Sequence, residues 1–81
     1  MDNIGNIFAA YRKNLKYSQQ DICDKLTGIG IPTKPAAYST WETGNSIPNA
    51  VQFLAMCKIL GITNIFNQFI GGYNPDDPMA E

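Results

Sequence analysis

The sequence predicts an all-α protein, a compact bundle of five short helices, and three observations lead to this fold class. Apolar residues recur at steps of three and four through most of the chain, which is the spacing of one helix face. Residues that commonly begin helices, such as Ser18 and Asn49, alternate with glycines that commonly end them. No segment is a convincing strand candidate, and no internal repeat is present.

The first two helices are predicted from an apolar stripe and a cap. The stripe consists of Ile4, Ile7, Phe8, Tyr11 and Leu15. Asp2 or Asn3 is placed to cap this helix. Ser18 begins the second helix, because its hydroxyl can accept from a backbone N–H three residues on, where Asp21 can reach back. Its inward residues are expected to be Ile22, Cys23 and Leu26, and the glycines of segment 27–30 end it.

The third helix is predicted to begin at a proline. Pro35 suits the first helical position and pushes Lys34 out of the helical region, so Lys34 lies near the cap. One face of this helix holds Ala37, Tyr38 and Trp41, with the two aromatic rings read as core. The other face holds Pro35, Ala36, Ser39, Thr40 and Thr43. Gly44 and Asn45 stop the helix.

Two further helices complete the prediction. Pro48 and Asn49 open the fourth, which is mostly apolar and closes at Gly61. Thr63 caps a short fifth helix over residues 64–70. We expect one domain over residues 1–72. Residues 73–81 contain two prolines and adjacent acids, and they indicate a flexible tail or a linker toward a possible further region.

The charges are unevenly distributed, although the net charge is only −1. Residues 1–40 carry five cations against three acids, a net of +2, whereas residues 41–81 carry one cation against four acids, a net of −3. No global basic field therefore indicates nucleic acid, but the positive half contains the second and third predicted helices.

The cysteines, the absence of histidine and the hydropathy of the chain limit which compartment and which cofactors can be expected. Cys23 and Cys57 occupy apolar positions of helical patterns, which favours reduced core residues over a disulfide. The chain has no histidine, so a zinc site of the usual type lacks ligands, and no metal or cofactor is expected. There is no membrane-spanning run and no signal peptide, so we expect a cytoplasmic protein.

Three sequence stretches together resemble a known family. They are YSQQDICDKL, YSTWETGNSIP and LAMCKILGI, which lie within residues 17–62. In order and spacing they are similar to the XRE-type helix-turn-helix transcriptional regulators, the phage repressor and Cro type. The similarity covers roughly residues 4–70, and it departs from the shortest members in a longer turn, TGIGIPTK, before the third helix. It implies a lambda-repressor-like DNA-binding domain with the third helix in the major groove.

The resemblance also implies roles for individual residues. Those expected to contact bases or phosphates are Gln19, Lys34, Pro35, Ala36, Ser39 and Thr40. Those expected to contact the DNA backbone beyond the third helix are Thr43, Asn45 and Ser46. Arg12 and Glu42 match a family pair that bridges the first and third helices. We interpret that pair first as a structural ion pair, with phosphate contact by Arg12 as a secondary role.

The chemistry of these positions predicts modest base specificity. Pro35 and Ala36 offer no hydrogen bond, and Ser39 and Thr40 donate to or accept from any base. Gln19 could simply be a solvated residue at the start of its helix, but the positive helix terminus favours a nearby phosphate, so we place the phosphate contact first. Specificity should therefore depend more on dimer spacing and DNA shape.

A homodimer on a near-palindromic operator is expected, because one module of this size buries little surface on DNA. The fifth helix supplies apolar residues for a two-fold contact, namely Phe66, Phe69 and Tyr73, with Ile62 and Ile65 beside them. The alternative that these rings complete the monomer's core is equally open.

Three functions can be compared. The sequence favours a DNA-binding transcriptional regulator, most simply a repressor. A protein-interaction module on the same fold, such as an antirepressor or an antitoxin-like partner, is the alternative, supported by the acidic pI of about 5.1 and the third helix's lack of amides. An enzyme is disfavoured, because the sequence offers no histidine, no nucleophile–base pair and no glycine-rich phosphate loop.

Overall fold

The computed structural model describes residues 4–69, and these residues form an all-helical globule without strands. The helices are α1 (Ile4–Asn14), α2 (Gln19–Gly28), α3 (Pro35–Thr43), α4 (Ala50–Leu60) and α5 (Ile65–Phe69). The predicted all-α class and the five helices in this part of the chain are therefore confirmed. The proposed boundary at residue 72 and the tail 73–81 lie outside the described residues.

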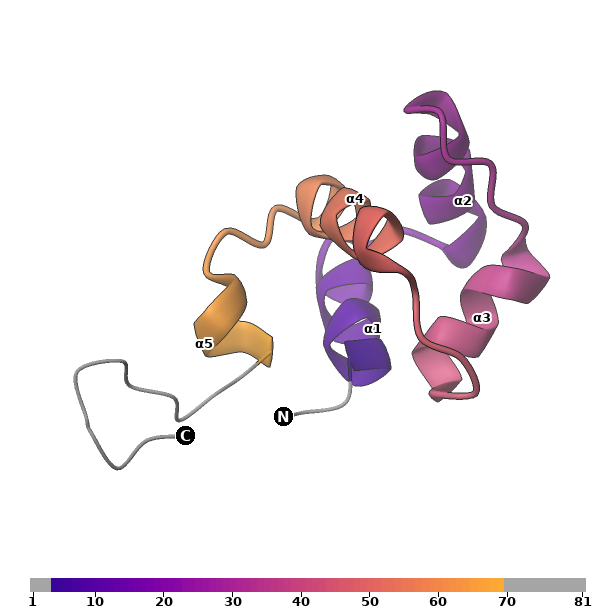
Figure 1. Ribbon diagram of the computed structural model, residues 1–81. Coiled ribbons are helices and arrows are strands. Elements are labelled where there is room, and N and C mark those ends of the chain that lie inside the picture. The colour runs from indigo at the N-terminus through magenta and orange to yellow at the C-terminus, as the bar shows by residue number, and fades with distance from the viewer. Residues whose placement is uncertain (1–3, 70–81) are drawn as a thin grey trace, which may run out of the picture.

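Helix α1 is the centre of the arrangement, because it packs against α3, α4 and α5. Helix α2 packs against α3 and α4. Figure 1 shows α2 and α3 together on one side of α1, with the short α5 on the other side. The chain thus divides into a pair, α2 and α3, and a support made of α1, α4 and α5.

The helix ends follow the capping signals of the sequence. Ser18 caps α2 in a reciprocal box with Asp21, and Asn49 caps α4 in the same way with Gln52. Helices α3 and α4 each end at a glycine in the left-handed region, where a side chain would be strained. Helix α1 ends differently, because Lys16 takes that conformation, with φ of 62°.

The core is apolar throughout, and aromatic rings fill its centre. Phe8, Ile22, Leu26, Tyr38 and Met56 have no exposed surface. Both cysteines are free and buried, as predicted, and burial raises the pKa of each thiol above its ordinary value. No buried polar side-chain atom among the described residues lacks a hydrogen-bond partner.

Gly5 allows α1 to approach α3 very closely. A Cβ atom at this position would overlap the carbonyl oxygen of Trp41 and lie 2.5 Å from that of Glu42. Glycine lowers the helix propensity of α1, but only its missing side chain permits this contact. Gly5 therefore positions α3.

Two apolar positions differ from the prediction. Leu15 is 42% exposed, because α1 ends at Asn14 and the helical spacing no longer applies beyond it. Ala37 is exposed, since it lies one helical step from Tyr38, at the edge of the buried face. The predicted caps Asp2 and Asn3 fall outside the described residues.

The helices of residues 4–69 were also compared with the requirements for crossing a bilayer. None of them has the length and the apolar character that a membrane span needs.

Candidate functional site

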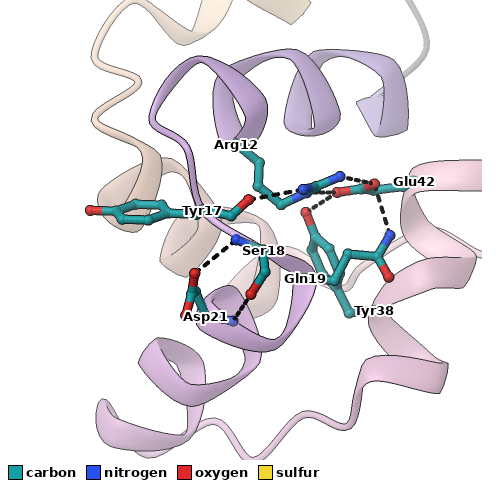
Figure 2. A network of polar contacts seen from close by, with 7 residues as sticks. All are labelled: Arg12, Tyr17, Ser18, Gln19, Asp21, Tyr38 and Glu42. Atoms are coloured by element: carbon teal, nitrogen blue, oxygen red, sulfur yellow. Dashed lines mark hydrogen bonds and ion pairs between the residues drawn. The ribbon is translucent and has the colours of Figure 1, made fainter.

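A cluster of polar side chains joins α1, α2 and α3. Figure 2 shows Arg12, Gln19 and Tyr38 converging on the carboxylate of Glu42. Arg12 donates from Nε to Oε2 at 2.6 Å and from Nη2 to Oε1 at 3.0 Å. Gln19 Nε2 also donates to Oε1, at 3.0 Å, and the Tyr38 hydroxyl donates to Oε2, at 2.5 Å. Each carboxylate oxygen thus accepts two hydrogen bonds. We call these four residues the Glu42 cluster.

The cluster holds its charges nearly out of water. The side chains of Arg12 and Glu42 are only 11% and 9% exposed. Burial by itself would raise the pKa of Glu42, but hydrogen bonds from Arg12, Tyr38 and Gln19 outweigh it and lower that pKa. The hydrogen bond to Glu42 raises the pKa of Arg12, whereas burial and then the neighbouring carboxylate raise that of Tyr38. Arg12 and Glu42 are therefore both charged at neutral pH.

The Arg12–Glu42 ion pair predicted from the sequence is present, and all three guanidinium nitrogens donate within the protein. The remaining nitrogen, Nη1, donates to the backbone carbonyl of Tyr17 at 2.9 Å. Because every nitrogen of the guanidinium has a partner within the protein, Arg12 fastens α3 to α1 and to the turn before α2. Three of the five guanidinium N–H groups are used here, and phosphate contact by Arg12 stays a prediction.

The outer face of α3 lies opposite the anchored side chains. Tyr38 and Trp41 are buried, whereas Lys34, Pro35, Ala36 and Thr43 are exposed. Ser39 and Thr40 are half-buried on the same outer side. The surface they form has only small side chains apart from Lys34, and no acidic residue occurs between Lys25 and Trp41.

The hydroxyl groups of this face are already engaged by the backbone. Ser39 donates to the carbonyl of Ala36, and Thr43 donates to the carbonyl of Thr40. Thr40 donates to the carbonyl of Ala37 at 2.6 Å. Each proton is therefore used inside the helix, and the oxygens remain as acceptors, with that of Thr40 already accepting from the Ser46 hydroxyl.

Thr40 also holds the loop that follows α3. Its Oγ1 lies 2.5 Å from the Ser46 hydroxyl oxygen, and its carbonyl accepts from the Ser46 amide at 3.2 Å. Asn45 and Ser46 are exposed beside the end of α3. Asn45 and Ser46, which were predicted to contact the DNA backbone, therefore lie next to the outer face of α3.

The first backbone N–H groups of α2 and of α3 differ in their hydrogen-bond partners. At α2, Asp21 accepts from the Ser18 amide at 2.8 Å, which lowers the pKa of Asp21. At α3, Lys34 makes no side-chain cap hydrogen bond, so the first amides of this helix lack that partner. Of these two helix starts, only that of α3 lacks a side-chain cap.

The described part of the chain is positive. Residues 4–69 contain six cations and three acids, a net of +3, because Asp2, Asp76, Asp77 and Glu81 lie outside it. The acidic pI therefore reflects the ends of the chain and not the folded helices. Lys25 stacks over the ring of Tyr17, with Nζ 4.8 Å from its centroid, a contact that the sequence did not predict.

Of the two interpretations left open for the rings of α5, Phe69 follows the one in which they complete the monomer's core. Phe69 is 2% exposed, and its ring lies 5.9 Å from that of Phe8 and 4.8 Å from that of Phe53. It belongs to the core because α5 folds back onto α1. Ile62 is likewise buried, and Ile65 packs against the core. Tyr73 and the side chain of Phe66 lie outside the described residues.

Two features of α3 and of the segment after it were not predicted from the sequence. Tyr38 was predicted to be core only, yet its hydroxyl completes the Glu42 cluster. Ile47, Val51 and Leu54 were not singled out, yet they are 76%, 65% and 58% exposed. Neither the hydrogen bond of Tyr38 nor the exposure of the three apolar side chains follows from local sequence, because both depend on how the helices pack. Among the described residues, no group of three potential metal ligands lies together.

Comparisons with protein-family models, with curated proteins and with solved structures found no match to this chain.

Proposed function

We propose that this protein is a sequence-specific DNA-binding transcriptional regulator of the helix-turn-helix type that represses by occupying promoter DNA. The observation that carries the proposal is the division of α3 into two faces. Tyr38, Trp41 and Glu42 fasten one face to the protein, and the opposite face is left exposed with small side chains. A core needs no such surface, whereas a helix that enters the major groove does.

The electrostatics support the same function. A net charge of +3 over residues 4–69 favours a polyanionic partner, and no acid interrupts the segment from Lys25 to Trp41. Lys34 stands at the uncapped start of α3, where its ammonium and the helix terminus both favour a phosphate. In this proposal α3 is the recognition helix and α2 crosses above it.

The contacts divide into positioning and reading. Lys34, Asn45 and Ser46 would position the protein on phosphates. Ser39 and Thr40 would accept from amino groups of bases, because their own protons are donated to the backbone. Pro35 and Ala36 would pack against thymine methyl groups.

Gln19 has a double role in the proposal. One N–H of its amide donates to Glu42, which leaves a second N–H for a phosphate near the start of α2. A dimer would place two such surfaces on half-sites about one helical turn, ~34 Å, apart.

Selection of duplexes from a random pool, followed by salt titration of the selected site, tests the proposal. With about four cations engaged per protomer and about eight per dimer, the logarithm of affinity should fall with log salt at a slope of about −7. Lys34→Ala should weaken binding to all sequences and reduce the slope by about 1 per protomer.

Lys58→Ala is the matched control, because it removes the same charge from the last turn of α4. It should leave the slope nearly unchanged. A pool that yields no preferred duplex, or a slope near zero, would contradict DNA binding and favour the protein-interaction alternative.

A further inference from the structure

The outer face of α3, from Pro35 to Thr43, presents no side-chain hydrogen-bond donor. Pro35 and Ala36 are exposed and have no polar side-chain atom. The other members carry hydroxyl groups, and each proton is donated to the backbone carbonyl three residues earlier. The distances are 3.0 Å for Ser39, 2.6 Å for Thr40 and 3.2 Å for Thr43. This face therefore offers acceptor oxygens and small apolar groups only.

The loop after α3 adds no donor to the face. Thr40 Oγ1 lies 2.5 Å from Ser46 Oγ, and because Thr40 donates to Ala37, the proton between the two hydroxyls is that of Ser46. The Thr40 oxygen is thus held from two sides, which fixes the rotamer of this side chain and the direction of its methyl group. The nearest exposed amino and amide groups are those of Lys34 and Asn45, which precede and follow the helix.

The chemistry of the major groove decides what such a face can distinguish. Guanine presents two acceptors, N7 and O6, which are commonly read by arginine or lysine donors, and this face has no such donor. Adenine and cytosine each present an amino group, so acceptor oxygens fit an A·T pair and a G·C pair alike. The remaining difference is the C5 methyl group of thymine, which small apolar side chains contact.

The length of the face sets how many base pairs it can contact. At ~1.5 Å of rise per residue, the side chains from Pro35 to Thr40 extend over roughly 7.5 Å along the helix axis. Base pairs follow one another at ~3.4 Å along DNA, so this length corresponds to about three base pairs.

We propose that α3 recognises the C5 methyl groups of pyrimidines, in a run of about three A·T pairs in each half-site. The inference rests on the proposed function, and it names the chemical group that the DNA-facing surface distinguishes. A 5-methylcytosine carries the same methyl group at the same place, so the face should also prefer a methylated G·C pair to an unmethylated one.

The first test removes single methyl groups from the DNA. Each thymine of the selected duplex is replaced in turn by deoxyuridine, which keeps every hydrogen-bonding group of the base pair. Fluorescence anisotropy should show that affinity falls about fourfold at each thymine that α3 contacts, the value expected for burying one such carbon. The dependence of affinity on salt should not change, because no phosphate contact is altered.

Two further base analogues separate methyl recognition from hydrogen bonding. Replacing one contacted A·T pair by G·C, with cytosine in the place of thymine, should weaken binding, and 5-methylcytosine at that position should recover about fourfold. Replacing adenine by 7-deazaadenine removes the N7 acceptor and should leave the affinity unchanged within about twofold, because no side-chain donor of α3 faces it.

A variant of the protein connects the effect to α3. Ala36→Gly removes the exposed methyl group of the second residue of this helix, and the ratio of affinities for thymine and deoxyuridine should approach one at one position of each half-site. Ala50→Gly is the matched control, because Ala50 is exposed in the first turn of α4. It should keep the ratio of the unmodified chain. A ratio of two affinities is insensitive to a general loss of stability in either variant.

Three results would overturn the inference while leaving DNA binding intact. Deoxyuridine could bind as well as thymine at every position, 7-deazaadenine could weaken binding strongly, or the selected half-sites could be rich in guanine. Each of them would show that donors, and not the small side chains of α3, read the bases. If no duplex is selected at all, the proposed function fails and the inference fails with it.

Discussion

Helix α1 makes two interfaces that depend on different physics. Toward α4 and α5 it presents Phe8, whose ring lies 6.0 Å from that of Phe53 and 5.9 Å from that of Phe69. Toward α3 it presents Gly5 and Arg12, a close backbone approach and a charged hydrogen-bonded contact with Glu42. One interface is apolar and the other is largely polar.

The difference shows which of the two interfaces fixes the orientation of a neighbouring helix. Aromatic packing is stabilised by burial and tolerates small shifts, because rings contact each other over a range of angles. A carboxylate with four donors permits one rotation of α3, the helix whose outer face we propose to read DNA. The aromatic side therefore mainly provides stability, and the polar side mainly provides orientation.

The aromatic side should show the largest loss on truncation. Phe69→Ala removes a ring that is 2% exposed, and we expect it to lower the free energy of unfolding by about 4 kcal/mol, from lost burial and a cavity. Urea denaturation measures this. Phe69→Leu is the control and should cost about 1.5 kcal/mol. A loss below about 1 kcal/mol for Phe69→Ala, closer to the range of surface substitutions, would return Phe69 to an exposed role.

The polar side should show a smaller loss with strong coupling. Glu42→Gln leaves the buried guanidinium of Arg12 without its counter-charge, and we expect a cost of about 3 kcal/mol. Arg12→Met should also destabilise, but the double variant should be more stable than the sum of the two changes predicts. Simple additivity in denaturant unfolding would mean that the pair does not act as a unit.

Acid should gradually reduce the contribution of the Glu42 cluster to the free energy of unfolding. The lowered pKa of Glu42 means that the folded protein keeps this carboxylate ionised at a pH where the unfolded chain, with an ordinary value of 4.5, is already protonated. Its contribution is thus present above pH 4.5 and is lost as the pH falls through the lower folded pKa.

Thermal unfolding between neutral pH and strong acid measures this loss. Asp21, whose pKa is lowered by its hydrogen bonds with Ser18, contributes in the same direction. Asp21→Asn should therefore retain the Glu42 part of the acid dependence, whereas Glu42→Gln should remove it. The same pH dependence in Glu42→Gln and in the unmodified chain would contradict the role assigned to this carboxylate.

The smallest effect is expected at the turn that leads from α1 to α2. Lys16 has φ of 62°, and the amides of Lys16 and Tyr17 bond back to the carbonyls of Lys13 and Arg12. Glycine prefers this position, so Lys16→Gly should stabilise the protein by about 0.5 kcal/mol. Lys13→Gly, inside the helix, should instead destabilise it by about 1 kcal/mol. Destabilisation by Lys16→Gly in urea denaturation would contradict the backbone interpretation.

Local patterns in the sequence determined the helices. Ser18 with Asp21, Pro35 and Asn49 mark three helix starts, and glycines mark the ends of α3 and α4, because capping depends on residues within one turn of each other. The inward positions of α2 and of Tyr38 and Trp41 also followed from helical spacing. The Arg12–Glu42 pair was implied only by the family resemblance.

Tertiary structure alone decided the roles of the remaining residues. Phe69, Val51 and Leu54 are all apolar residues in short helices, yet the first is buried and the other two are exposed. Spacing within a helix cannot distinguish them, because burial depends on which other helix packs there. From the sequence, Gly5 is similarly only a residue of low helix propensity, and its role follows from the close approach of α3. The sequence by itself determined where α2, α3 and α4 begin and where α3 and α4 end, and the packing of the helices decided which surfaces remain for a partner.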